Sequence, residues 1–314
     1  MIGSTRYVRR IVESTLVKHR TKYFASKQFS SSKYTYRCFF IPSSLTHRYR
    51  CTSNSTRNHS KTITPPSRSV NPIVELREYE LFPSQMEQYI HLTSQLPDIV
   101  QSPVATAGIR LIATPQTGWK INTAAHFHYF EGGFEERTKI LDTMASCPKW
   151  NQYNRLVNTC MMNIQSSVFV EAPFVYSTEA VCGLELEKAG QELQGSMGTE
   201  IDTPRIYEIR RYQLKLGYDT VPTFLQLYEE GLSSKLNAKG TDPSTTLMTL
   251  LYSDVGALNT VIEIWRHGDT SAMERSRVAA RTATEWRDSI AQIATLAIDF
   301  TTSIYRPVTS SPLR

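Results

Sequence analysis

Long apolar runs are absent from this 314-residue chain. No stretch approaches the ~18 consecutive apolar residues that a membrane-crossing helix needs, so we expect no transmembrane segment. Cysteine is sparse, and the five cysteines form no Cys-x-x-Cys pair, which removes the usual support for a zinc site or a disulfide framework. The motifs GxSxG, GxGxxG and HExxH and the phosphate-binding loop are also missing. The sequence therefore predicts no catalytic residue and no cofactor.

Acidic residues are nearly absent from the first 70 positions. Residues 1–70 hold 14 of the 35 Lys and Arg residues but a single acid, Glu13, so residues 71–314 carry a net charge of −7. A protein that binds a phosphate backbone needs Lys and Arg clustered on its folded surface. The acidic body argues against that role, and we expect no nucleic-acid partner.

The basic segment has the composition of a targeting sequence. It is rich in Arg, Ser and Thr and lacks the apolar core of a secretory signal, and Tyr7, Val8 and Ile11 fall on one side of a helix whose other side is cationic. These features are typical of a mitochondrial transit peptide. We expect residues 1–40 to be that peptide and residues 41–71 to be a disordered spacer; a disordered basic tail is the alternative. The expected location is the mitochondrion, in the matrix or associated with a membrane.

A charged pattern occurs twice in the remaining chain. VELREYELFP begins at Val74, and IYEIRRYQLK begins at Ile206. Both contain Glu-x-Arg-x-Tyr-x-Leu, which places the matching residues at Glu75, Arg77 and Tyr79, and at Glu208, Arg210 and Tyr212. The 133-residue separation exceeds the ~20–50 residues of solenoid repeats. We call this repeated Glu-x-Arg-x-Tyr-x-Leu pattern the echo, and we interpret it as evidence of a duplicated domain.

Hydrophobic periodicity predicts the same order of elements after each copy. In the first half we expect strands at 73–82, 108–114, 123–130 and 163–170, with helices at 84–95 and 134–146 and a further helical turn from Pro148. In the second half we expect strands at 205–216, 247–252, 260–267 and 298–306, with one helix capped by Asp219 and another at 271–297.

Each half therefore reads β-α-β-β-α-β, the ferredoxin-like arrangement in which both helices cover one face of an antiparallel sheet. The bare face of such a sheet has to pack against something. We expect an α+β fold, with two tandem ferredoxin-like β-α-β-β-α-β units packed sheet to sheet as a dimeric-type α+β barrel within one chain. The two domains are expected at 72–171 and 205–307, joined by a linker at 172–204.

Strand alternation assigns each side chain to one face of its sheet. We expect the apolar set to face the helices of its own half: Leu76, Ala125, Phe127, Ile209, Ile262 and Ile264. The opposite face, toward the other sheet, then carries the candidate pocket or interface residues: Glu75, Arg77, Tyr79, His126, His128, Glu208, Arg210, Tyr212, Glu263 and Trp265. In one interpretation these charges pair and hold the sheets in register. In the other they line a ligand pocket.

The sequence HFH places two histidines on one face of a predicted strand. His126 and His128 offer two imidazoles, whereas a metal site usually needs at least three protein ligands. No third ligand is evident nearby. We therefore interpret them as packed or pocket-lining residues, and we predict no metal site.

These patterns resemble the NIPSNAP domain. The resemblance is carried by the repeated Glu-x-Arg-x-Tyr-x-Leu, by GALNTVIEIWRH (256–267), by the segment Arg275–Trp286 and by IYRP (304–307). It covers roughly residues 73–306. The first half departs more, because INTAAHFHYF places His128 where the family tends to have Trp.

The resemblance implies a dimeric-type α+β barrel fold, a mitochondrial location and no established catalytic residues. It also implies a non-enzymatic protein that acts through protein partners, such as autophagy adaptors or mitochondrial proteins, in mitophagy signalling or vesicular transport. The alternative is binding of a small ligand or haem, or monooxygenase-type chemistry, in a cavity between the two sheets. Homo-oligomerisation stays open.

Overall fold

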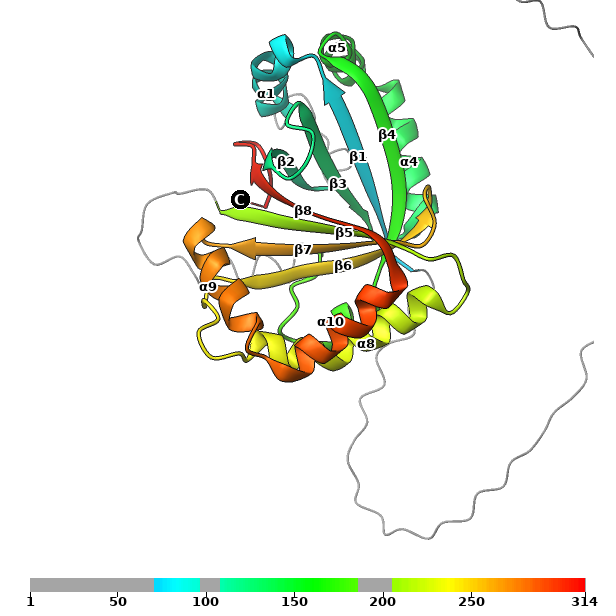
Figure 1. The fold of residues 1–314 in the computed structure, drawn as a ribbon. Coiled ribbons are helices and arrows are strands. Elements are labelled where there is room, and N and C mark those ends of the chain that lie inside the picture. The colour runs from blue at the N-terminus through cyan, green and yellow to red at the C-terminus, as the bar shows by residue number, and fades with distance from the viewer. Residues whose placement is uncertain (1–70, 97–107, 186–204, 314) are drawn as a thin grey trace, which may run out of the picture. The chain divides into compact units, whose positions relative to one another are not determined.

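A computed structural model of the chain describes residues 71–96, 108–185 and 205–313 (Figure 1). All of these residues belong to one compact unit, Thr64–Arg314. The expected transit peptide lies outside the described residues, and so do the expected spacer, apart from Asn71, and residues 186–204 of the expected linker.

The first half of this unit has the predicted order of elements. Its strands are β1 (Ile73–Leu81), β2 (Ile109–Thr117), β3 (Thr123–Phe130) and β4 (Met161–Glu171). Its helices are α1 (Met86–Ser94), α4 (Gly133–Ser146) and α5 (Pro148–Asn158). Pro148 begins α5, where its fixed φ suits the first helical turn and its missing N–H is not needed. Phe134, near the start of α4, is 46% exposed.

The second half follows the same order. Its strands are β5 (Ile206–Leu214), β6 (Thr246–Val255), β7 (Thr260–His267) and β8 (Ala297–Pro307). Its helices are α8 (Thr220–Leu236), α9 (Thr270–Ala280) and α10 (Thr284–Leu296). The prediction of a single helix at 271–297 was wrong, because the chain turns between α9 and α10. Ala283 is extended there, and the Thr282 hydroxyl bonds the Ala279 carbonyl at 2.7 Å, a side-chain bond that competes with helix continuation.

The described strands form a single antiparallel sheet that closes into a barrel, in the order β1-β3-β2-β8-β5-β7-β6-β4. Each half supplies four neighbouring strands, and short pairings of β2 with β8 and of β4 with β6 join the halves. Figure 1 shows the helices outside this barrel, with α4 and α5 beside β4 and α8 and α10 side by side below the second-half strands. The expected α+β class is confirmed.

The barrel interior is a filled apolar core that draws on both halves. Eight-stranded barrels are just wide enough for side chains to fill them. The buried interior cluster includes Leu76, Leu111, Phe127, Ile209, Ile264 and Tyr305. Two further apolar clusters lie between the sheet and the helices, one in each half. Within the part of the chain that the structure describes, no helix is long and apolar enough to cross a membrane.

One ion pair joins β1 to β5, which stand opposite each other in the closed strand order. The guanidinium of Arg211 donates to both carboxylate oxygens of Glu78, at 3.0 and 2.8 Å. The Arg211 guanidinium carbon also lies 4.8 Å from the centroid of the Trp119 ring. This bidentate geometry is the strongest form of an Arg–carboxylate pair. The pair therefore fixes the two halves relative to each other.

The beginning of the expected linker packs against the barrel. After the short helix α6 (Phe174–Ser177), Val181 forms a parallel bridge with Leu247 of β6. Leu184 is buried in the interior cluster, and its carbonyl accepts a hydrogen bond from Nε of Arg110 at 3.0 Å. Over residues 172–185 the expected linker therefore packs against the barrel instead of lying free of it. Periodicity missed it because this segment is buried without being a long helix or strand.

Candidate functional site

The ten candidate residues lie on the outer face of the barrel, under the helices. The assignment of faces was therefore wrong: Leu76, Phe127 and Ile209, expected against the helices, pack in the barrel interior. Tyr212 and Trp265 instead belong to the cluster beneath the second-half helices. The physical reason is that both faces of these strands are buried. The helices carry ion-pairing partners for the charged strand residues. Charged residues can therefore lie on the strand face that the helices cover.

The glutamate of the first copy accepts hydrogen bonds from three different elements. Glu75 is buried and accepts from Arg77 of its own strand at 3.0 and 3.1 Å, from Arg137 of α4 at 2.8 and 2.9 Å and from Ser166 of β4 at 2.7 Å. Burial by itself raises the pKa of Glu75, but these donors outweigh it and hold the pKa well below its usual range. This ionised carboxylate ties β1 to α4 and β4.

The second glutamate repeats that arrangement. Glu208 accepts from Nε of Arg210 at 2.6 Å, from Arg277 of α9 at 2.7 Å and from the Thr302 hydroxyl of β8 at 3.1 Å. Nε2 of His267 lies 3.3 Å from its other oxygen. Burial raises the pKa of Glu208, but the hydrogen bonds and the charge of Arg210 keep it far below its usual range. The echo is therefore structural in both halves.

The first-half histidines are buried and neutral. His126 faces Arg77 in the β1–β3 register, and its Nε2 lies 2.7 Å from the hydroxyl of Tyr89 on α1. Nε2 of His128 has no hydrogen-bond partner among the described residues. Burial, with the nearby positive charge of Arg77, lowers the pKa of His126 to about 3 and that of His128 well below its usual value. In the described ranges no group of three His, Cys, Asp or Glu side chains could hold a metal ion.

The buried histidine predicts a pH-dependent stability. Because the folded pKa of His126 is lowered from 6.5 to about 3, its contribution is complete above pH 6.5 and is lost as the pH falls toward 3. Lowering the pH from 7 to 5 should therefore cost the wild type about 2 kcal/mol more than a His126→Gln variant. Urea unfolding at both pH values measures this difference. Equal losses in the two proteins would contradict it.

In the second half the position facing Arg210 holds Glu263, which is fully buried. Its carboxylate accepts from the hydroxyls of Tyr212 at 2.9 Å and Tyr228 at 2.7 Å, from Nζ of Lys235 at 3.0 Å and from the indole N–H of Trp265. Burial raises the pKa of Glu263, but the neighbouring cations and these donors lower it to about 2. A completely satisfied carboxylate thus lies beneath α8.

The amine of Lys235 sits between two indole rings. Its Nζ is 3.7 Å from the ring centroid of Trp265 and 4.3 Å from that of Trp286, distances at which both ring faces attract a cation. Burial lowers the pKa of Lys235 to about 8, although the charge of Glu263 opposes the shift. The lysine is therefore held by a carboxylate on one side and by aromatic faces on the others.

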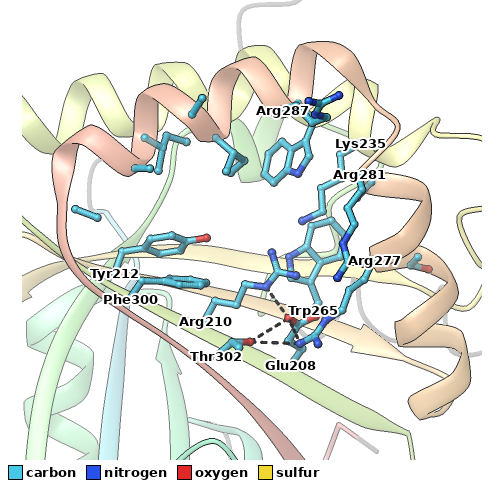
Figure 2. Close-up of a pocket in the computed structure, with 18 of the residues that line it drawn as sticks. Glu208, Arg210, Tyr212, Lys235, Trp265, Arg277, Arg281, Arg287, Phe300 and Thr302 are labelled. Atoms are coloured by element: carbon cyan, nitrogen blue, oxygen red, sulfur yellow. Dashed lines mark hydrogen bonds and ion pairs between the residues drawn. The ribbon is translucent and has the colours of Figure 1, made fainter.

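A pocket of about 780 Å³ opens beside this cluster, between the outer face of β5, β7 and β8 and the helices α9 and α10 (Figure 2). Figure 2 shows Lys235, Arg277 and Arg281 toward one end and Tyr212 and Phe300 at the other. The rings of Tyr212 and Phe300 are 4.7 Å apart. One end of the pocket is therefore cationic and the other aromatic.

Sequence reasoning found part of this pocket. Of the ten candidates, four line it: Glu208, Arg210, Tyr212 and Trp265. The first-half candidates do not line it. The charged and aromatic pocket residues that were missed include Lys235, Arg277, Arg281, Arg287 and Phe300. Only Lys235 carried a usable signal, since it continues the helical spacing of the buried Tyr228 and Leu232 and so places a cation in an apolar stripe.

Comparison with known proteins identifies the half that holds the pocket. The NIPSNAP family profile matches residues 207–312. No curated protein matches the chain significantly. Among solved structures, a NIPSNAP family protein of unknown function from Agrobacterium tumefaciens is 25% identical, with 37% of this chain and 98% of that chain covered and a TM-score of 0.32.

Two other solved structures resemble the chain over a longer stretch. They are proposed monooxygenases from Lactobacillus acidophilus and Fusobacterium nucleatum, 10% and 11% identical, covering 77% of this chain and 97% and 94% of their own, with TM-scores of 0.50 and 0.51. At this identity they show the fold alone. Residues 207–312 therefore form a NIPSNAP domain.

Proposed function

We propose that this NIPSNAP-domain protein binds a small, partly apolar molecule in the pocket between β5, β7, β8 and the helices α9 and α10. The observation that carries this proposal is the composition of a pocket of about 780 Å³, in which aromatic and aliphatic side chains surround a few convergent polar groups. Ligand sites typically have this size and this lining. The location replaces the cavity expected between two sheets, because the barrel interior is filled.

The polar groups of the pocket favour binding over catalysis. Glu208 and Glu263 are both ionised and bonded to cations, and Lys235 is paired with Glu263. A general base or nucleophile needs a group that is free to exchange a proton or a bond. We therefore assign these side chains to holding the pocket in shape, and we propose no catalytic residue.

The location and the partners are further proposals that rest on the sequence. The basic, acid-poor leader supports import into mitochondria, and the family resemblance supports protein partners in mitochondrial quality control or vesicular transport. We also infer that residues 72–171 and 205–307 are tandem copies of one domain, supported by the echo and by the matching element order. A tagged protein that stays in the cytosol with its leader intact would contradict the mitochondrial proposal.

The pocket can be tested by filling it from an exposed position. Ala294 of α10 lines the pocket, whereas Gln292 of the same helix is exposed and lies outside the lining. Native mass spectrometry of the protein purified from its own cells should show an added small-molecule mass. We expect Ala294→Trp to lose that mass and Gln292→Trp to keep it. Apo masses in all three proteins, with no saturable binding of dodecanol or dodecanoate, would overturn the proposed function.

A further inference from the structure

The pocket is positively charged in a protein body that is acidic overall. Its lining contains five cationic side chains, Arg210, Lys235, Arg277, Arg281 and Arg287, against the carboxylates of Glu208 and Asp299. Even with the buried Glu263 counted, the site has an excess of two positive charges. Residues 71–314 together carry a net charge of −7. The positive charge is therefore a local property of this pocket, where it raises the concentration of anions.

Two of the five cations are available to a ligand. Arg210 and Arg277 are bound to Glu208, and Lys235 is bound to Glu263. Arg281 and Arg287, by contrast, make no ion pair or side-chain hydrogen bond with any residue in 71–96, 108–185 and 205–313. They stand on either side of the turn between α9 and α10, and both line the pocket.

The remaining lining changes character along the pocket. Phe300 and Tyr212 lie at the end away from Arg277 and Arg281 (Figure 2). Ile290 and Ala294 of α10 extend the apolar wall. An occupant with one charged end and one apolar end would satisfy both regions, whereas a fully polar anion would leave the apolar wall against water.

We propose that the pocket binds an amphiphilic organic acid, with its anionic group at Arg281 and Arg287 and its apolar body along α10 toward Phe300. This inference rests on the proposed function and specifies the class of its ligand. The guanidinium groups supply charge-assisted hydrogen bonds to the acid, and the apolar wall supplies burial area for its chain. Since both arginines are exposed, binding weakens as salt rises.

Three long-chain probes separate head-group recognition from apolar burial. Calorimetric titration of the full-length protein should show that dodecanoate binds about tenfold more tightly than dodecanol, and that dodecyltrimethylammonium binds most weakly, because the alkyl chains are nearly equal in length and the charge of the head group differs. In an Arg281→Gln/Arg287→Gln double variant, the affinity for dodecanoate should fall to that for dodecanol. Arg155→Gln, an exposed change on α5 outside the pocket lining, is the matched control and should leave both affinities unchanged.

The outcomes distinguish this inference from the proposed function. Equal affinities for dodecanoate and dodecanol, both abolished by Ala294→Trp, would overturn the anion assignment and leave the binding function in place. A preference for dodecanoate that survives the double arginine variant would also overturn it. If neither dodecanoate nor dodecanol binds and native mass spectrometry shows only apo masses, the proposed function itself is rejected.

Discussion

Replacing Glu263 by Gln should lower the free energy of unfolding by about 3–5 kcal/mol. The substitution keeps the shape of the side chain but removes the negative charge that Lys235 contacts at 3.0 Å. Lys235 and Arg210, which is 3.5 Å from Glu263, would then be cations in a buried cluster without this counter-charge. Breaking one partner of a buried ion pair is costly because the remaining charge cannot be solvated. Guanidinium unfolding at pH 7 measures the change.

Two variants test the cause of that loss. In Glu263→Gln/Lys235→Met both members of the pair are gone, so part of the stability lost in the single variant should return. Glu135→Gln removes an exposed carboxylate that pairs with Lys139 on α4 and should change stability far less than Glu263→Gln does. A Glu263→Gln protein as stable as Glu135→Gln would show that the buried cluster contributes little.

Replacing Phe127 by Ala should destabilise the protein by about 3–5 kcal/mol. Phe127 is fully buried in the barrel interior, in a cluster that also contains Ile209 and Tyr305 of the other half. The substitution therefore opens a cavity in the core that the two halves share. We expect thermal unfolding in one transition at a lower temperature, because neither half keeps a complete interior when the shared core is weakened.

The matched control for this prediction is Phe134→Ala on α4. Phe134 is 46% exposed, so its loss creates no closed cavity and should cost at most about 0.5 kcal/mol. If Phe134→Ala proved as damaging as Phe127→Ala, the assignment of Phe127 to the interior and of Phe134 to the surface would be wrong.

The elements were predictable because their signals are local. The alternation in β5 and β7 and Pro148 at the start of α5 each act within a few residues. Asp219 does precede α8, but its side chain makes no capping hydrogen bond there. The turn between α9 and α10 was missed because it contains neither Gly nor Pro. At this turn the hydroxyl and the N–H of Thr282 both bond the Ala279 carbonyl, a local arrangement that no helix-breaking residue type announces in the sequence.

The alternation of residues separates the two faces of a strand, but it does not show which face points into the barrel and which points toward the helices when both are buried. We expected Leu76 and Ile209 to face the helices, because the charged residues on the opposite strand face argued against placing that face on the core under the helices. In the structure, Arg137 and Arg277 from the helices neutralise Glu75 and Glu208. Such partners come from positions far along the chain, and no spacing rule connects them. Most pocket residues were missed for the same reason, because the fold brings them together from distant positions in the chain.

The ion pair between Glu78 and Arg211 affects which halves can pair with each other. These residues are 133 positions apart and occupy the same place in the two copies of the echo. In a barrel made from two identical chains, the corresponding positions would bring carboxylate against carboxylate or guanidinium against guanidinium, and like charges at close range repel. Opposite charges at matching sites thus select a mixed pairing. A first half released from the chain should prefer a second half to another copy of itself.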